Sequence, residues 1–237
     1  MATNSNQLPL SRPRVVVCLS GGMDSTVCAA LAARDFDAYA VHFSYGQRTE
    51  ARELQAAREI ASSLGFVQFL PLRVDLFRTI GGSALTDTSI AVPIAGPHDS
   101  DIGAEIPVTY VPFRNAHFLS AAVSWAEVLG AGTIYIGAVE QDSSGYPDCR
   151  PAYYDAFNAL IRLGTKEGNI RVETPLIHLR KDDIVRLGLE LHAPLHVTWS
   201  CYSSGAFACG VCESCVLRLR AFQRVGIPDP IAYAPQT

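Results

Sequence analysis

The amino-acid sequence predicts an α/β protein built on a doubly wound, Rossmann-like parallel sheet. The run Val15-Val16-Val17 is continuous and β-branched, which is typical of a strand buried on both faces. Apolar strands then alternate with Ala-rich helical stretches at the spacing of βαβ units. The 237 residues are 49% hydrophobic and 18% charged, so the chain can bury a sizeable core. We therefore expect one α/β domain with a C-terminal appendage.

The expected elements follow one another in a regular order along the chain. Apolar, β-branched runs predict the strands, and Ala-, Leu- and Glu-rich stretches predict the helices. Residues 81–110 form an irregular stretch rich in Gly, Pro, Ser and Asp. The strands are expected at 14–19, 38–43, 67–74, 133–137 and 170–174, and the helices at 26–34, 50–64, 115–129, 153–163 and 181–189. Ligands of such sheets bind at the carboxyl ends of the strands.

Charge and composition argue against several classes of protein. The formal net charge is −4 and no segment carries a long run of Lys and Arg, so direct binding to nucleic acid is not expected. Residues 1–13 are polar and lack the basic start and apolar core of a signal peptide, and we expect this N-terminus to be flexible. No apolar run approaches membrane-spanning length. A cytoplasmic protein is therefore expected.

A glycine-containing segment directly follows the first strand and opens the first helix: Ser20-Gly21-Gly22-Met23-Asp24-Ser25-Thr26. The two glycines let the backbone approach an anion, and the helix start presents unpaired amides and the positive end of the helix dipole. The hydroxyls of Ser20, Ser25 and Thr26 can donate to phosphate oxygens, and Asp24 can cap the helix or hold Mg²⁺. The segment therefore predicts a phosphate-binding loop.

Other known motifs do not fit this segment. GxxxxGK[ST] does not occur, which argues against a Walker nucleotide site, and no GxGxxG follows the strand, which argues against a dinucleotide site. A nucleophile elbow would need Gly where Cys18 stands. The remaining alternative is a tight turn between strand and helix, with Ser25 as the helix cap.

Four of the seven cysteines gather in one C-terminal window, at Cys201, Cys209, Cys212 and Cys215. Four thiolates fill a tetrahedral shell, so they predict one structural zinc ion per chain with no open position for substrate. A redox CxxC would not explain four clustered thiols. A zinc ribbon that binds nucleic acid would need basic residues between the cysteines, where Glu213 is the only charged residue. Cys18 and Cys28 are expected in the core.

Three polar segments follow predicted strand ends or open a helix. They are Ser44-Tyr45-Gly46-Gln47-Arg48, Val111-Pro112-Phe113-Arg114-Asn115, and the run from Asp142 to Arg150, DSSGYPDCR. Each alone is equally well explained as a polar loop with a structural Gly or Pro. Their shared position predicts that they meet at the active edge of the sheet.

The loop SGGMDS resembles the SGGxDS mark of the ATP pyrophosphatases, whose fold is that of the adenine nucleotide alpha hydrolases. That resemblance implies cleavage between the α and β phosphates, leaving AMP on a substrate oxygen. SGGMDS, SYGQR, VPFRN, DSSGYPDCR and the four-cysteine tail, in this order over about residues 14–220, resemble the 7-cyano-7-deazaguanine synthase family of queuosine biosynthesis. Phe113 departs from that family, which often has a small residue there.

The family resemblance implies an ATP-dependent ligase that converts 7-carboxy-7-deazaguanine and ammonia into a nitrile, through an adenylylated acid, an amide and an adenylylated amide. It implies ATP, Mg²⁺ and Zn²⁺ as cofactors, and we expect a homodimer. The catalytic residues would be Asp24, Arg114 and Lys181. ATP would be held by Ser20, Gly21, Gly22, Met23, Asp24, Ser25 and Thr26. The substrate would be held by Tyr45, Gln47, Arg48, Arg114, Asn115, Asp142, Tyr146, Asp148 and Arg150.

Side-chain chemistry suggests roles for some of these residues. The planar fork of Arg114 suits phosphate or carboxylate, the Asp148 carboxylate suits the N–H edge of a guanine-like ring, and Tyr146 suits stacking on that ring. The resemblance to SGGxDS enzymes implies a further role, because Lys181 matches a lysine that such enzymes often place near the leaving pyrophosphate. A surface lysine in the first turn of a helix is an equal alternative. An adenylate route needs no thioester, and no neighbouring His in the sequence supplies a base, so a covalent role for Cys149 is the less favoured alternative.

We expect three regions: the flexible residues 1–13, an ATP-binding α/β domain over 14–195, and a zinc-binding segment over 196–237. Other functions stay open as alternatives. Another SGGxDS enzyme could thiolate tRNA, serve as an amidotransferase synthetase domain, or attach the deazaguanine to another acceptor. From a different class, a zinc-stabilised module could sense ATP without turning it over.

Overall fold

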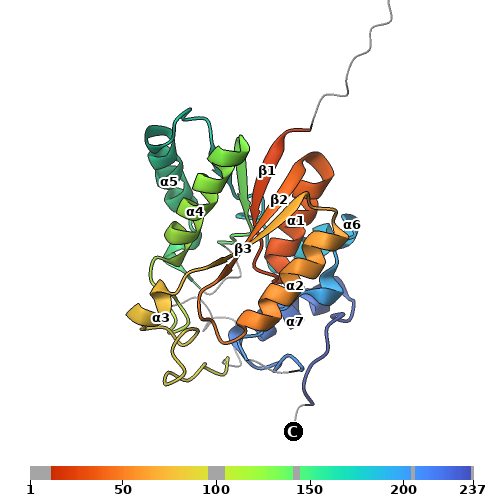
Figure 1. Cartoon of the computed structure of the whole chain (residues 1–237). Helices are drawn as coiled ribbons and strands as arrows, with labels where there is room; N and C mark the ends of the chain where they lie inside the picture. The colour runs from red at the N-terminus through yellow and green to blue at the C-terminus, as the bar shows by residue number, and fades with distance from the viewer. Residues whose placement is uncertain (1–11, 96–104, 141–144, 204–205, 236–237) are drawn as a thin grey trace, which may run out of the picture.

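The computed structural model describes residues 12–95, 105–140, 145–203 and 206–235. At its centre is a parallel sheet of five strands in the order β3-β2-β1-β4-β5. Figure 1 labels three of them, β1, β2 and β3. The strands are β1 (Arg14–Cys18), β2 (Asp37–Ser44), β3 (Gln68–Arg73), β4 (Thr133–Ile136) and β5 (Arg171–Glu173). The strand order reverses between β1 and β4. This is the switch point at which ligands of open α/β sheets bind.

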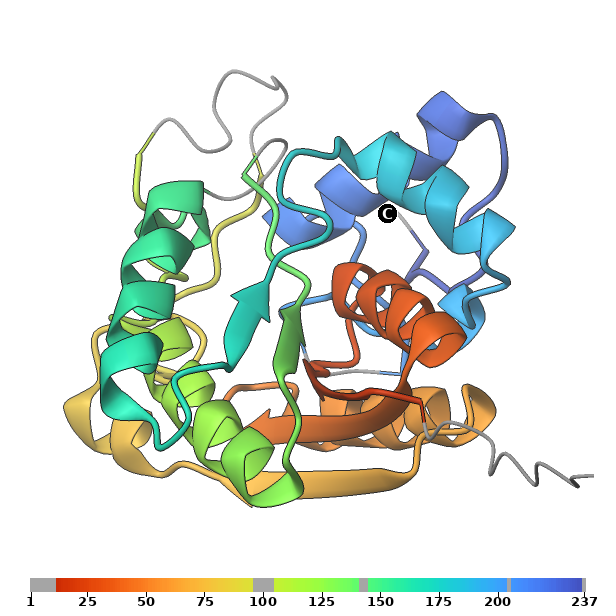
Figure 2. The ribbon, with the colours of Figure 1, turned by 90° about the horizontal axis from the view of Figure 1, so that it is seen from above.

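Helices cover both faces of the sheet, which confirms the doubly wound fold. Figure 2 shows α4 (Arg114–Leu129) and α5 (Pro151–Gly164) on one side, with α1 (Met23–Asp35), α6 (Lys181–Glu190) and α7 (Glu213–Val225) on the other. Helix α2 (Glu50–Ser63) packs on the same side as α1. Each predicted strand and helix is present, with ends shifted by three residues or fewer.

Strand β1 is buried on both faces, as its β-branched run predicts. Val16 and Cys18 pack with α4 and α5, whereas Val15 and Val17 pack with α1 and α2. All three valines are 0% exposed. The alternation follows from the pleat, which turns successive side chains to opposite faces. The carboxyl end of this fully packed strand therefore holds the next residues, Leu19 and Ser20, in a fixed place.

Two helices were not predicted from the sequence. Helix α3 (Leu76–Ile80) is a short helix of five residues that buries Phe77 just before the irregular stretch. Helix α7 begins after Cys212 and ends at Gly226, whose φ of +83° is the usual left-handed helix stop. Two short 3₁₀ turns, η2 (Pro147–Cys149) and η3 (Leu195–Val197), also occur.

A buried ion pair joins parts of the C-terminal segment to one another. Arg218 on α7 and Asp229 are each 2% exposed at the side chain, and the guanidinium donates to both carboxylate oxygens at 2.7 and 2.9 Å. Arg218 also donates to Thr198 Oγ1 at 2.7 Å, and Tyr233 donates to Asp229 at 2.7 Å. Every charge in this cluster has partners, so the pair fixes α7 to the chain that leads into the cysteine site.

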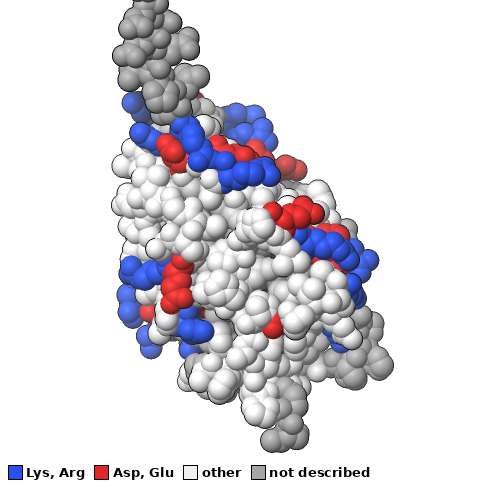
Figure 3. Space-filling model, turned by 90° about the vertical axis from the view of Figure 1, so that its right-hand side faces the viewer, with Lys and Arg blue, Asp and Glu red and all other residues white. Residues whose placement is uncertain are grey.

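The surface carries no large field of one sign on the face shown in Figure 3. Acidic and basic residues are interspersed around a broad uncharged area on this face. Among the described residues, none of the helices has the length and hydropathy needed to span a membrane.

Candidate active site and metal centre

The phosphate loop leaves the carboxyl end of β1, and its first glycine is required by the fold. Gly21 has φ +92°, a conformation that L residues rarely adopt. A Cβ at Gly21 would lie 2.6 Å from the carbonyl oxygen of Glu53 on α2. The glycine therefore lets the loop pass directly over α2.

The second glycine has no such structural reason. Gly22 has φ −81° and ψ 168°, an extended conformation open to any residue. A Cβ there would meet only Ser20 Oγ at 3.5 Å, Ser200 Oγ at 3.6 Å and the Trp199 carbonyl at 3.6 Å, which are ordinary contacts. The absence of a side chain at Gly22 instead keeps the start of α1 open toward the cavity.

The hydroxyls of the loop hold its shape. Ser25 and Thr26 donate to the Gly22 carbonyl at 3.0 and 2.8 Å, and the Ser20 and Ser25 hydroxyls lie 2.9 Å apart. Thr26 is 0% exposed, so its hydroxyl stabilises the loop rather than facing the cavity. Gly137 lies against this helix start, where a Cβ would come within 2.8 Å of the Ser25 amide nitrogen. The end of β4 is therefore in close contact with the loop.

A cavity of about 290 Å³ opens at this edge of the sheet. An adjoining cavity of about 200 Å³ shares Asp24 and Arg114 and adds Lys181. Together they are of the order of small-molecule sites, roughly 300–1,000 Å³. The sequence-predicted residues that line the larger cavity are Ser20, Gly22, Met23, Asp24, Ser25, Tyr45, Gln47, Arg48, Arg114, Asn115 and Tyr146.

Asp24 and Lys181 lie together although 157 residues separate them. The Lys181 ammonium forms an ion pair with Asp24 Oδ2, and its side chain is only 13% exposed. Asp24 Oδ1 is buried and has no hydrogen-bond partner among the described residues. Since an unpartnered buried carboxylate oxygen is costly, it is available to a cation or a donor of a bound ligand. The structure thus places Lys181 at the phosphate loop and not on the open surface.

Arg114 is buried in the wall of the cavity between two aromatic rings. Its guanidinium carbon lies 5.5 Å from the ring centre of Tyr45 and 5.8 Å from that of Phe118, and it donates to the Tyr45 hydroxyl at 3.1 Å. Burial alone lowers the pKa of Arg114, but Tyr45, Tyr146 and Asp148 raise it overall, so the group stays charged. Its Nε is buried and has no hydrogen-bond partner in the part of the chain that the structure describes. A fixed positive charge with a donor to spare suits an anionic ligand.

Gln47 and Arg48 are held by the protein itself. Gln47 accepts from the Tyr45 amide at 2.8 Å and donates to Glu53 at 2.9 Å. Arg48 donates to the carbonyl oxygens of residues 84, 87 and 90 at 2.7, 2.9 and 2.6 Å. Both line the cavity, but these contacts make them supports of its wall.

The polar segment after β4 is only partly at the cavity. Tyr146 lines it, with its hydroxyl 3.0 Å from Thr109 Oγ1. Asp148 is 4% exposed and accepts from the Asn115 amide at 3.3 Å, so its carboxylate caps the start of α4 and does not line the cavity. Arg150 is exposed before α5, away from the cavity. Asp142 lies outside the described residues.

Cys149 lines the cavity as a protonated thiol. Burial, with a smaller contribution from Asp148, raises the pKa of Cys149 to about 12. A reactive cysteine needs surroundings that favour the thiolate, and these disfavour it. The environment therefore gives no support to Cys149 as a nucleophile.

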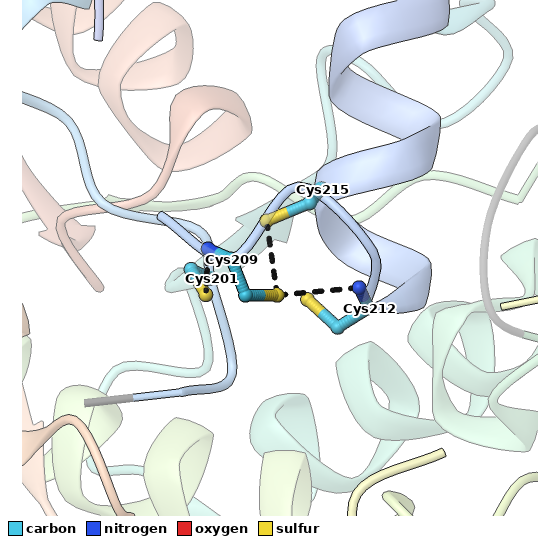
Figure 4. Close-up of side chains that lie close together, drawn as sticks. All are labelled: Cys201, Cys209, Cys212 and Cys215. Carbon is cyan, nitrogen blue, oxygen red and sulfur yellow. Dashed lines mark hydrogen bonds between the residues drawn. The ribbon is translucent and has the colours of Figure 1, made fainter. Parts of the chain in front are cut away.

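The four C-terminal cysteines form a compact cluster (Figure 4). Their sulfur atoms all lie within 4.8 Å of one another, and Cys209 Sγ is 3.9 Å from Cys215 Sγ. Sulfurs at about 2.3 Å from a tetrahedral zinc ion would be roughly 3.8 Å apart. Two backbone amides, those of Ser203 and Cys209, donate to Cys201 Sγ at 3.3 Å, which favours a thiolate there. The cluster therefore fits one tetrahedral metal ion with four protein ligands.

One known protein family matches most of the chain. The profile of the queuosine biosynthesis protein QueC family matches residues 14–226. The chain belongs to the QueC family. The QueC match covers the phosphate loop, the cavity and all four cysteines.

Two 7-cyano-7-deazaguanine synthases are closely similar to this QueC-family chain. The protein from Acidobacterium capsulatum is 74% identical over 223 residues, 94% of this chain and 97% of the relative. That from Koribacter versatilis is 64% identical over 226 residues, 94% of each chain. Among solved structures, an NH₃-dependent NAD synthetase from Campylobacter jejuni matches at 16% identity and a TM-score of 0.47, over 79% of this chain and 67% of that one. That likeness is too distant to bear on the reaction.

Several residues of the cavity wall were missed by the sequence analysis. Glu53 on α2 lines it, as do residues beside the metal ligands: Trp199, Ser200, Tyr202 and Ser214. Burial raises the pKa of Glu53, whereas hydrogen bonds from Thr49 and Gln47 lower it in part. The residues beside the metal ligands had one signal in the sequence, which was their closeness to Cys201 and Cys215. That closeness indicates a metal site and gives no indication of the cavity.

Proposed function

We propose that the chain is an ATP-dependent carbon–nitrogen ligase that converts 7-carboxy-7-deazaguanine and ammonia into 7-cyano-7-deazaguanine for queuosine biosynthesis. The observation that carries this proposal is the cavity that joins the SGGMDS loop, the Asp24–Lys181 pair and Arg114 in a chain of the QueC family. The names of the similar relatives support the substrate and the product.

The proposed reaction has two rounds of activation. The substrate carboxylate attacks the α-phosphate of ATP and releases pyrophosphate, and ammonia then displaces AMP to form the amide. The amide oxygen attacks a second ATP and again releases pyrophosphate. Loss of both protons from the nitrogen and of AMP, which carries away the former amide oxygen, leaves the nitrile. Each nitrile therefore consumes two ATP and one ammonia. Adenylylation is needed because neither oxygen can leave by itself.

The phosphate loop supplies the charge stabilisation that this reaction requires. The open start of α1 presents first-turn amides and the positive end of its dipole to the triphosphate. Asp24 would hold Mg²⁺ through its unpartnered Oδ1, and the Lys181 ammonium beside it would neutralise charge on the leaving pyrophosphate. Held there, Mg²⁺ would supply charge stabilisation to the triphosphate.

Another part of the cavity wall would hold the reacting carboxylate. We propose that Arg114, charged and buried, binds it through its free Nε, and that Tyr45 and Tyr146 provide aromatic surface for the ring system. Asp148 is better placed to fix the Arg114–Asn115 helix start than to contact the ring. The four-cysteine site would hold zinc as a structural ion, because its shell leaves no position for substrate.

The test combines purified protein with ATP, ammonium and 7-carboxy-7-deazaguanine and follows the nitrile by mass spectrometry. Asp24→Ala and Lys181→Ala should abolish the nitrile while the melting temperature stays within a few degrees of wild type. Arg180→Ala is the matched control, since that side chain is half exposed and outside both cavities. Nitrile formation unchanged in Asp24→Ala would refute the assignment. Sulfur dependence or tRNA binding would instead indicate the thiolation alternative.

We also propose that the chain works in the cytoplasm as a homodimer. Seven free thiols, four of them clustered, suit a reducing compartment. Ile94 and Val211, 77% and 36% exposed, are neighbours beside the metal segment, where the Ala95 amide donates to the Val211 carbonyl. Exposed apolar neighbours favour a contact with a second copy. Light scattering of the purified chain should give twice the monomer mass, and Ile94→Glu should lower it.

A further inference from the structure

The chain just before Cys201 lies on the phosphate loop. The Trp199 amide donates to the Gly21 carbonyl at 2.8 Å, and the Met23 amide donates to Ser200 Oγ at 3.4 Å. Ser200 Oγ and the Trp199 carbonyl are also the closest protein atoms, apart from Ser20, to the position that a Gly22 Cβ would take. Residues almost 180 positions apart therefore build one surface at the start of α1.

The Met23 amide is one of the first-turn donors of α1, which have no partner within the helix. Its contact with Ser200 is at the long end of hydrogen-bond distances. A hydroxyl can also donate, so Ser200 can turn its proton toward an anion that takes the Met23 amide. Both groups line the same cavity.

The position of Ser200 is fixed from both sides. Thr198 is held by the buried Arg218, which donates to its hydroxyl at 2.7 Å. Cys201 is a ligand of the proposed metal site, and Ser214, next to the ligand Cys215, lines the same cavity. Trp199, between Thr198 and Ser200 in the sequence, is 3% exposed, and the Arg52 guanidinium lies 5.0 Å from its ring centre. The metal cluster therefore adjoins the nucleotide cavity through the residues next to its ligands.

We infer that Ser200 is a nucleotide-binding residue that donates its hydroxyl to the triphosphate, and that the four-cysteine metal site holds it in place. The metal would then set the affinity for ATP, although it makes no contact with ATP. This inference rests on the proposed function. The sequence predicted a phosphate site made of residues 20–26 alone. The inference adds to that site a hydroxyl donor from the C-terminal segment.

Two physical effects should determine how much Ser200 and the metal contribute to ATP affinity. One is the strength of a hydrogen bond to a charged oxygen, and the other is the entropy lost when the segment that supplies this bond becomes ordered. Loss of one such bond corresponds to roughly a 10- to 150-fold loss of affinity. Without metal, residues 199–202 must be ordered when the nucleotide binds, because cysteine sites of this kind become ordered only with their ion. Metal loss should therefore weaken ATP binding at least as much as removal of the hydroxyl.

The test measures binding of ATP with Mg²⁺ by titration calorimetry, together with metal content and melting temperature. Ser200→Ala should bind ATP roughly 10- to 150-fold more weakly while metal content stays the same and the melting temperature shifts by only a few degrees. Ser203→Ala is the matched control, because that exposed serine contacts the cluster through its backbone amide, which the substitution keeps. It should bind ATP as wild type does.

A second readout uses Trp199 as a fluorescent probe. In a Trp125→Phe background it is the single tryptophan of the chain, and ATP should change its emission. Cys212→Ser in that background should shift the emission of the free protein and weaken the ATP response. If wild type binds ATP and Ser200→Ala binds it equally well, the inference is wrong while the proposed function stands. If wild type itself does not bind ATP, the proposed function fails, and the inference fails with it.

Discussion

The two adjacent glycines of the phosphate loop should respond to the same substitution in opposite ways. Gly21→Ala forces an L residue into φ +92° and places a Cβ 2.6 Å from the Glu53 carbonyl oxygen. The left-handed conformation costs roughly 1–2 kcal/mol, and overpacking against backbone adds roughly 1–3 kcal/mol. Because 1 kcal/mol shifts the melting temperature of a chain of this size by roughly 2–4 °C, Gly21→Ala should lower it by roughly 4–20 °C.

Gly22→Ala should leave stability almost unchanged. Its backbone is extended, and the new Cβ meets its neighbours at 3.5 Å or more. Reduced entropy of the unfolded chain favours Ala by roughly 0.4–1 kcal/mol, and loss of a favourable helix cap costs about as much. Binding should suffer instead, because the methyl group faces the place of the phosphates. The loss of one hydrogen bond to a charged oxygen corresponds to roughly 10- to 150-fold weaker ATP binding.

The assay pairs thermal unfolding by circular dichroism with ATP titration calorimetry on the two variants. The reasoning predicts a destabilised Gly21→Ala and a stable Gly22→Ala that binds ATP poorly. Equal destabilisation of the two variants would show that Gly22 is structural. A stable Gly22→Ala with undiminished ATP affinity would remove this loop from nucleotide binding.

Three further predictions concern the cysteines and the buried ion pair. Cys149→Ala should retain turnover within about tenfold of wild type. Native Cys149 should resist alkylation at neutral pH, because its pKa is raised to about 12, and peptide mapping of the alkylated protein can check this. Cys212→Ser should lose metal and stability together, and elemental analysis showing a Cys212→Ser variant with its full zinc content would contradict the site. Arg218→Met should lower the free energy of unfolding by roughly 3–5 kcal/mol, because it leaves the Asp229 carboxylate buried without its partner charge. The double variant with Asp229→Asn should recover part of this loss, as measured by unfolding in denaturant.

The sheet could be predicted because its signals are local. The β-branched run in β1 and the Ala-rich stretch after Gly22 each fix an element from neighbouring residues alone. Helix α7 also had signals, with Glu213 in its first turn and Gly226 as its stop. It was missed because the cysteines at its start were interpreted as a metal segment without secondary structure.

The composition of the cavity wall could be predicted only in part. SGGMDS is contiguous, and the carboxyl ends of neighbouring strands must share an edge, so Asp24, Tyr45 and Arg114 were expected to meet. The positions of Ser200 and Glu53 depend on how the C-terminal segment and α2 pack against the rest of the fold. A short sequence motif carries no information about that packing. Asp148 carries the chemistry of a ligand-reading residue, but tertiary packing uses its carboxylate to cap α4.

The central claim is that this loop directs attack on the α-phosphate of ATP. The most direct measurement is phosphorus NMR of a reaction of purified protein with ATP, Mg²⁺, ammonium and 7-carboxy-7-deazaguanine. The account predicts AMP and pyrophosphate, two of each for every nitrile found by mass spectrometry, and neither in Asp24→Ala. ADP and inorganic phosphate as the main products would contradict it.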